Sequence, residues 1–343
     1  MSALLILLGL AAALSCLATR AVLALLRRAA ILDHPNDRSS HAVPTPRGGG
    51  IAVIASIVVA SLGWSMVAGQ PGSDQTGGGL GVALALAIGL SVLSFVDDLR
   101  NLSAGIRLAA HFLAVAGGLW ALGGHGAFAA YLPQPLDLAL TALGWLWFIN
   151  LYNFMDGIDG IVGSETAAIA VGVGGLAVLG LAPATLFAPS AAILGAAIGF
   201  LVWNWHRAKI FLGDSGSIPL GFLMGYLLVA TAQPGGAALA AALVLPLVFV
   251  LDASVTLLRR LARGKKPTEA HREHAYQRAT QGGWPHDRVC LAVIAANAGL
   301  IALAWLVAPV QPWLTVVLGL AVAALCYGLL MRVYDLDRAR GSA

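Results

Sequence analysis

The sequence predicts an all-α integral membrane protein that crosses the bilayer about eleven times. Of its 343 residues, 59% are hydrophobic and only 10% are charged, whereas soluble domains carry about 25% charged residues. Its apolar runs match the roughly 20 residues that a helix needs to cross the hydrocarbon core. We expect helices because lipid-exposed sheet edges are not viable, and a barrel would show short alternating segments. The whole chain, 1–343, is expected to form one transmembrane domain.

Each predicted span is an apolar run that ends at a turn-rich or charged piece. The first run, MSALLILLGLAAALSCLATRAVLALL, lacks the basic start of a secretory signal and is too long for its apolar region, so we expect an uncleaved helix. Later runs are separated by pieces such as GQPGSDQTGGG, LPQP and APVQP, which favour turns. The predicted spans are 2–27, 48–68, 79–96, 106–123, 138–152, 161–181, 186–204, 216–232, 236–258, 288–308 and 312–331.

The basic residues are distributed unevenly between the two sides of the membrane. The connections near 69–78, 124–137, 182–185, 233–235 and 309–311 contain no Lys or Arg, so all 20 basic residues lie at or near the other side. Because cytoplasmic loops carry an excess of Lys and Arg, this pattern predicts an outer N-terminus and a cytoplasmic C-terminus. The cytoplasmic loops are then about 28–47, 97–105, 153–160, 205–215 and 259–287.

The carboxylates are concentrated on the same side. Only Asp74 and Asp137 of the 16 acidic residues fall on the outer side. Singly, an acid at a helix end is as easily an ordinary capping group, but several carboxylates that converge at one membrane face repel one another unless a cation binds. Mg²⁺ prefers such oxygen ligands and bridges to phosphates, and we expect Mn²⁺ to substitute for it. The acids at inner helix ends are Asp97, Asp98, Asp156, Asp159 and Asp214.

Spacing separates the expected roles of these acids. Asp97 and Asp98 are adjacent, so on a helix they point about 100° apart and cannot both face one ion squarely. Asp156 and Asp159 share a face if their segment stays helical, although Gly157 and Gly160 allow the backbone to depart from a helix. One acid of the first pair is expected to bind the metal or substrate, and the other has a different role.

Basic and imidazole side chains lie close to the acids in the chain. Each one alone is more readily a headgroup anchor on the cytoplasmic side, but together they suit a substrate with two phosphates. The segment 33–50 adds Arg38, His41 and Arg47; it either closes over the substrate or is a solvated loop. The candidate substrate-binding residues are Arg107, Asn153, Lys209, His271, Arg272, His274 and Arg278.

Five segments together resemble a known family. LDHPNDRSSHAVPTPRGGG, FVDDLRNLSAGIR, NFMDGIDG, KIFLGDSGS and the HREH loop are similar, in order and topological position, to segments of the polyprenyl-phosphate N-acetylaminosugar-1-phosphate transferases. The resemblance covers roughly 30–335 and includes the O-antigen-initiating enzymes and the phospho-MurNAc-pentapeptide translocase. It implies Mg²⁺-dependent transfer of a sugar 1-phosphate from a UDP-N-acetylaminosugar to undecaprenyl phosphate, with release of UMP.

The resemblance also implies roles for individual residues. Asp97, Asp98, Asp156 and Asp159 are carried over as catalytic, Asn153 and His274 as substrate-binding, and Asp214 as the metal ligand. HAYQ at 274–277 replaces the His-rich run of many relatives, which argues against the peptidoglycan enzyme and favours the O-antigen branch. Asn101 stands where some relatives have a third acid.

The resemblance places the protein in the bacterial inner membrane with its active site at the cytoplasmic face. The lipid bilayer and the two substrates are the expected partners, the sequence leaves the choice between monomer and homodimer open, and no nucleic acid is expected. The attack on phosphorus is direct or proceeds through an aspartyl phosphate. The alternative function is an ion-coupled transporter, which would place its acids near the midplane, often in paired repeats.

Overall fold

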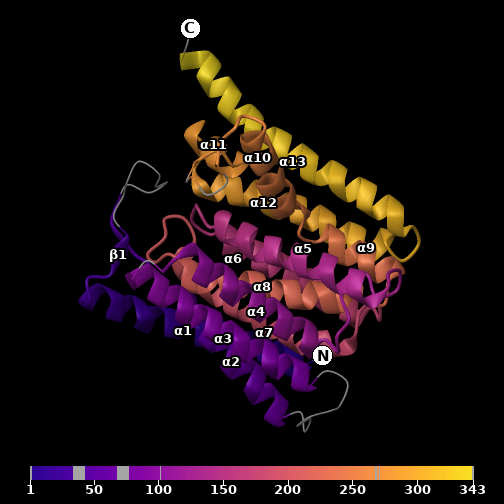
Figure 1. The fold of residues 1–343 in the computed structure, drawn as a ribbon. Helices are drawn as coiled ribbons and strands as arrows, with labels where there is room; N and C mark the ends of the chain where they lie inside the picture. Colours follow the sequence, from indigo (N-terminus) through magenta and orange to yellow (C-terminus); the bar gives the residue numbers. More distant parts are fainter. Residues whose placement is uncertain are drawn as a thin grey trace.

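The computed structural model describes residues 2–33, 43–67, 77–100, 102–266, 269 and 271–341. Within these residues the chain is a bundle of thirteen α-helices with almost no sheet, which confirms the predicted fold class (Figure 1). Four residues singled out in the sequence, Arg38, His41, Asp74 and Asn101, lie outside the described residues.

The elements follow one another with short connections. The helices are α1 (Ser2–Arg28), α2 (Gly50–Val67), α3 (Gly77–Arg100), α4 (Ala104–Ala121), α5 (Gln134–Phe154), α6 (Ile161–Val178), α7 (Phe187–Asn204), α8 (Asp214–Ala232), α9 (Gly236–Val244), α10 (Leu247–Leu261), α11 (Ala275–Gln281), α12 (His286–Ala302) and α13 (Pro312–Gly341). A 3₁₀ turn, η1 (Ala184–Leu186), precedes α7, and a π-helical turn, η2 (Leu303–Val307), follows α12. Two antiparallel strands, β1 (Leu32–Asp33) and β2 (Thr45–Pro46), pair between α1 and α2.

The number of candidate spans is slightly smaller than predicted. Nine helices in the described residues are long and apolar enough to cross a membrane, or ten if α9 and α10 form one span bent by 61°. The predicted span that is missing from these candidates is the fifth, 138–152, which corresponds to α5 and does form the expected helix. Its buried Asp137 accepts the amides of Gly126 (2.6 Å) and Phe128 (2.8 Å), so this acid stabilises the loop before the helix.

The bend between α9 and α10 has a local cause. Pro246 stands between the two helices, and proline lacks the amide that would continue a helical ladder. Because the sequence stays apolar through this point, hydropathy alone gave one span at 236–258. The bend turns α10 toward the charged end of the bundle, where it carries Asp252 and Arg260.

Helix α8 is the centre of the bundle. Its whole apolar stretch is buried, and it packs against α2, α3, α5 and α9. The ring of Trp145 from α5 stacks on Phe222 at 5.1 Å between centroids and donates its Nε1–H to the Phe222 carbonyl at 3.1 Å. A Cβ on Gly221 would lie 2.8 Å from Cβ of Tyr152, so glycine allows α5 and α8 to approach closely. This packing fixes the position of Asp214 at the start of α8.

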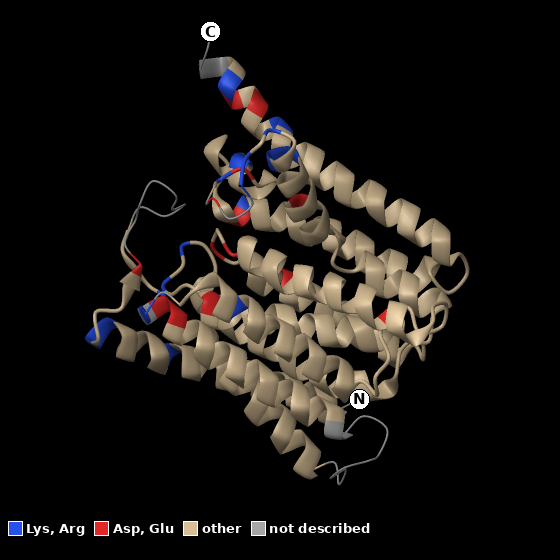
Figure 2. Cartoon of the chain, viewed as in Figure 1, with Lys and Arg blue, Asp and Glu red and all other residues tan. Residues whose placement is uncertain are grey.

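Charged side chains gather at one end of the bundle. Figure 2 shows Lys and Arg at the end opposite the N-terminus, and most acids lie at that same end. This one-sided distribution is the one expected from the sequence. It brings acidic and basic side chains together at the same end of the bundle, where they can form a binding site.

Candidate active site

Arg47 lies between two carboxylates that come from distant parts of the chain. Its Nη2 atom contacts Oδ1 of Asp214, at the start of α8, and lies 3.6 Å from Oδ1 of Asp98, near the end of α3. The chain around Arg47 is held by backbone contacts, since Gly48 and Gly49 donate their amides to the Phe211 carbonyl at 3.2 and 2.9 Å. The segment before α2 therefore lies against the loop that precedes Asp214.

Asp156 adds a third carboxylate to this group. It lies in the turn after α5, and the Gly213 amide donates to it. Burial raises the pKa of Asp156 to about 7; Asp214 adds to the rise, while Arg47 opposes it. Burial would lower the pKa of Arg47, but Asp214 and Asp98 outweigh that and raise it. Asp214 and Asp98 thus contact one guanidinium, and Asp156 lies close enough to interact with it electrostatically. We call Arg47, Asp98, Asp156 and Asp214 the Arg47 cluster.

The two adjacent acids of α3 have different partners. Asp98 faces Arg47, whereas Asp97 accepts the Leu102 amide at 2.6 Å and lies 3.3 Å from Nη1 of Arg107. The divergence is the one expected from a rotation of about 100° per helical residue. Asp97 therefore ties the end of α3 to the start of α4 and orients Arg107.

A cavity of about 610 Å³ brings several predicted residues together. Asn153 donates its Nδ2 to Ser217 Oγ at 3.0 Å, so the end of α5 is held against the first turn of α8 beside the cavity. Its polar lining includes Asp214, Asn153, Arg107, His111, His271 and His274.

His274 is positioned by a buried acid that sequence reasoning did not single out. Asp252 of α10 accepts the amides of Ala275 (2.9 Å) and Tyr276 (3.2 Å), and its Oδ1 lies 3.4 Å from Nδ1 of His274. The Tyr276 hydroxyl donates to the carbonyl of Phe154 at 2.9 Å. Helix α11 is thereby fixed between α10 and the NFMDGIDG turn.

The remainder of the His loop is held by a second, half-buried acid. Glu273 lies 2.5 Å from Nη1 of Arg260, 3.2 Å from Arg263 and 3.1 Å from Lys265. Burial raises the pKa of Glu273, but its hydrogen bonds to Lys265 and Arg260 outweigh this and hold that pKa below its ordinary value. The ring of His271 lies near that of His274 in a tilted arrangement, with 5.0 Å between ring centroids. Burial, and then the charges of His274 and Arg260, lower the pKa of His271 to about 4.

Three predicted substrate-binding residues do not line the cavity. Nη2 of Arg278 lies 3.6 Å from Glu273, and its guanidinium lies 5.1 Å from the centre of the Tyr334 ring. Lys209 lies over the ring of Trp203 at 5.2 Å, and the Arg272 carbonyl accepts a hydrogen bond from Gln281 at 2.8 Å. The structure therefore gives Arg278 and Lys209 contacts with protein rather than with the cavity.

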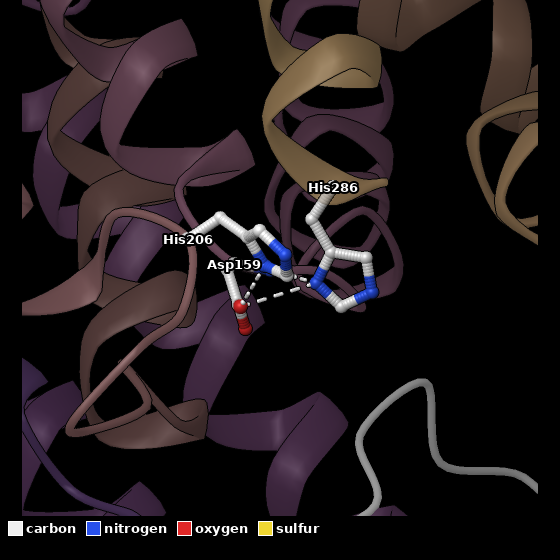
Figure 3. Close-up of side chains that lie close together, drawn as sticks. All are labelled: Asp159, His206 and His286. Carbon is white, nitrogen blue, oxygen red and sulfur yellow. Dashed lines mark hydrogen bonds and ion pairs between the residues drawn. The ribbon is translucent and has the colours of Figure 1, made fainter. Parts of the chain in front are cut away.

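Asp159 makes its contacts outside the Arg47 cluster (Figure 3). Its Oδ2 lies 2.8 Å from Nδ1 of His206, 3.2 Å from Nδ1 of His286, and 3.2 Å from the Ala208 amide that donates to it. Burial raises the pKa of Asp159, but the hydrogen bonds from His286 and His206 outweigh it and hold that pKa below its ordinary value. These three side chains are close enough to hold one ion, yet Oδ2 already has partners without one. We describe them as a hydrogen-bonded group that joins the turn after α5 to α7 and α12.

Three residues that contribute to the site were absent from the predicted set. The sequence predicts Arg47 only as part of the 33–50 segment, and it gives Asp252 and His111 no predicted role. His111 follows Arg107 by four residues, which places both on one helical face, so the spacing could have indicated it. The pairing of Arg47 with Asp214 spans 167 residues and has no local signal.

An acidic cluster, a cavity with cationic and imidazole groups, and a helical membrane bundle are the features of an enzyme that handles phosphorylated substrates at a membrane. The profile of glycosyl transferase family 4 matches residues 80–232, from α3 to the end of α8.

Curated relatives agree with this match. The decaprenyl-phosphate N-acetylglucosaminephosphotransferase of Mycolicibacterium smegmatis is 33% identical over 330 residues, which cover 85% of this chain and 79% of the relative. The phospho-N-acetylmuramoyl-pentapeptide-transferase of Moorella thermoacetica is 35% identical over 198 residues, covering 53% of this chain and 55% of the relative. A probable undecaprenyl-phosphate N-acetylglucosaminyl 1-phosphate transferase of Bacillus subtilis is 24% identical over 275 residues, covering 76% and 73%. The chain belongs to glycosyl transferase family 4, which confirms the resemblance noted in the sequence.

Proposed function

We propose that this protein transfers an N-acetylaminosugar 1-phosphate from a UDP-sugar to undecaprenyl phosphate and releases UMP. The reaction would take place at the cytoplasmic face of a bacterial inner membrane. The observation that carries the proposal is a polar cavity, lined by Asp214 and by Arg and His side chains, that adjoins an apolar groove.

The apolar groove supplies a place for the lipid part of the acceptor. It has a volume of about 520 Å³ and lies between α4 and α5. Leu108 lines both the groove and the polar cavity. A ligand that fills both therefore has an anionic end and an apolar chain, as a polyprenyl phosphate has. The groove is lined by Gly105, Leu108, Ala109, Phe112, Leu113 and Leu146.

The residues of the Arg47 cluster fit Mg²⁺. Asp214 and Asp98 both approach one nitrogen of Arg47, so the cluster offers oxygen ligands of the kind that Mg²⁺ prefers, with Asp214 as the principal ligand. When bound, Mg²⁺ would neutralise charge on the pyrophosphate of the donor. Mn²⁺, which also prefers oxygen ligands, is proposed as a substitute.

The proposed chemistry is a direct displacement at phosphorus. An oxygen of the acceptor phosphate attacks the β-phosphorus of the donor, a new O–P bond forms, and the bond to the bridging oxygen breaks. UMP leaves with that electron pair. Because the second pKa of a phosphate monoester is near 6, the acceptor is largely dianionic at neutral pH and needs little base assistance. Asp98 orients the reactants, while Arg107 and the His271–His274 wall contact phosphate oxygens.

The proposal also extends to the identity of the donor sugar and of the glycan that is built on the product. The names of the relatives favour N-acetylglucosamine, while the HAYQ sequence favours the start of an O-antigen or related lipopolysaccharide chain, in which a 6-deoxy aminosugar is a second candidate. Both undecaprenyl and decaprenyl phosphate are worth testing as acceptors.

The test is UMP release by purified protein with Mg²⁺, a polyprenyl phosphate and a panel of UDP-N-acetylaminosugars. We expect release that requires both substrates, stops with EDTA and is abolished in a folded Asp214→Asn variant. Full activity in that variant would contradict the metal assignment. Ion-driven solute movement in sealed vesicles without UMP release would favour the transporter. Inversion at a chiral β-phosphorus is expected; retention would indicate two displacements through an aspartyl phosphate.

A further inference from the structure

His111 is a buried polar side chain without a hydrogen-bond partner at Nδ1. It belongs to α4, is only 6% exposed and lines the 610 Å³ cavity, and its Nδ1 atom makes no hydrogen bond within the described part of the chain. An unsatisfied buried polar atom costs about 1–3 kcal/mol of stability. A group retained at that cost beside a cavity needs an explanation, and a ligand in the cavity that the ring turns to meet would provide the missing partner.

The position of His111 on α4 indicates which ligand that is. Ala104, Arg107, Leu108 and His111 are spaced by three and four residues and all line the cavity, as one face of a helix does. The next residue, Phe112, lines the apolar groove, as Leu108 also does. His111 therefore lies where the polar cavity meets the groove for an apolar chain.

Arg107, one turn before His111 on α4, already has a carboxylate partner in Asp97. Arg107 lies 3.3 Å from Asp97, and its side chain is 44% exposed. A dianionic phosphate placed beside α4 can therefore share Arg107 with Asp97, but it needs a further donor on the groove side. His111 is one helical turn from Arg107 in that direction.

We propose that His111 contacts the phosphate of the polyprenyl acceptor, with a ring nitrogen donating a hydrogen bond to a phosphate oxygen. This role rests on the proposed function and assigns His111 to the acceptor rather than to the UDP-sugar. The interaction holds the attacking phosphate at the mouth of the groove while the polyprenyl chain lies along α4 and α5.

Steady-state kinetics on three variants tests the assignment. His111→Leu removes the donor and keeps an apolar side chain of similar bulk; His111→Gln keeps an N–H donor; His125→Ala removes an exposed histidine from the loop that follows α4. A hydrogen bond to a charged group contributes about 1.5–3 kcal/mol. We therefore expect His111→Leu to lower kcat/KM for the acceptor by about 10-fold to 150-fold, where 1.4 kcal/mol is tenfold.

The expected pattern is specific to the acceptor. His111→Leu should leave KM for the UDP-sugar nearly unchanged, His111→Gln should recover most of the acceptor efficiency, and His125→Ala should match the wild type. Equal loss for both substrates in folded protein, or an unchanged acceptor kcat/KM, would overturn the proposal. If His111→Leu does not fold, His111→Ala provides the same comparison.

A binding measurement separates this inference from the proposed function. Farnesyl phosphate should raise the thermal unfolding midpoint of the wild type more than that of His111→Leu, whereas farnesol should affect both equally. Failure of the wild type to release UMP would contradict the proposed function, yet the difference in binding would still support the contact with a lipid phosphate. Equal stabilisation of both proteins by farnesyl phosphate would overturn it.

Discussion

Arg47 compensates only part of the negative charge that surrounds it. It contacts Asp214 and Asp98, and Asp156 lies close enough to affect its pKa. A single guanidinium beside three acids is the charge arrangement on which the proposed divalent-cation site rests. Because Asp98 faces Arg47 and Asp97 does not, we expect their substitution to affect metal binding differently.

Asp98 and Asp97 provide a direct comparison of neighbouring residues. Loss of a group beside a metal typically weakens binding about 10-fold to 100-fold, so Asp98→Asn should require that much more Mg²⁺ for half-maximal activity. Asp97→Asn should leave the Mg²⁺ requirement nearly unchanged and lower the thermal unfolding midpoint, because it weakens the contacts with Leu102 and Arg107. Titration of both variants with Mg²⁺ checks the prediction, and an equal shift in the two would contradict it.

His271 is expected to make the fold sensitive to acid. Its pKa falls from the ordinary 6.5 to about 4 in the folded protein, so the folded state favours the neutral ring. Its contribution to stability is therefore complete above pH 6.5 and is lost as the pH falls toward about 4, where the unfolded chain binds the extra proton.

The matching measurement is the unfolding midpoint of the wild type and of His271→Ala between pH 7 and pH 4. The wild type should lose stability relative to the variant as the pH falls, with a slope of up to about 1.4 kcal/mol per pH unit. A constant difference between the two proteins over this range would contradict the predicted titration.

At the scale of elements, α11 depends on one residue of α10. Asp252 accepts two amides at the start of α11, and loss of such a helix-capping acceptor costs about 0.5–2 kcal/mol. Asp252→Asn should therefore lower hydrogen-exchange protection of the amides at 275–278 and reduce kcat by displacing His274. The matched control is Asp287→Asn, in the first turn of α12, whose carboxylate accepts, within the described residues, only its neighbour's amide at Arg288. Equal protection in wild type and Asp252→Asn would contradict the role.

The sequence predicted elements well where hydropathy changes sharply. The predicted spans 161–181 and 186–204 correspond closely to α6 and α7, because glycine, proline and charged residues bound those apolar runs. The last predicted span ended at 331, but α13 continues to Gly341, since its polar final turns lie outside any apolar window. Helix α11 was missed because seven residues are too few to show a helical period.

Part of the site was predictable from local helical geometry. Adjacent acids on one helix must diverge, and the structure shows that Asp97 and Asp98 do. By contrast, the meeting of Arg47 with Asp98 and Asp214 depends on how β2, α3 and α8 pack, and no local pattern encodes that arrangement. The attraction of Asp159 to His206 and His286 likewise arises only when α7 and α12 meet the turn after α5.

At the scale of the whole molecule, the orientation in the membrane is a prediction from charge. We expect Gln134, at the start of α5, to face the outside and Arg263 to face the cytoplasm. In a background with Cys16, Cys290 and Cys326 replaced by serine, a membrane-impermeant maleimide should label Gln134→Cys in intact spheroplasts. It should label Arg263→Cys only after permeabilisation. The reverse labelling would contradict the orientation.

Helix α8 has no side that faces lipid, because other helices surround its whole apolar stretch. Among the candidate spans in the described residues, α8 alone is wholly buried, so the carboxylate of Asp214 stands on a helix that other helices separate from lipid. A change in membrane thickness or acyl composition would tilt the outer helices first and would reach this carboxylate only through their packing. The bundle in this way separates the proposed metal ligand from mechanical variation in the membrane that surrounds it.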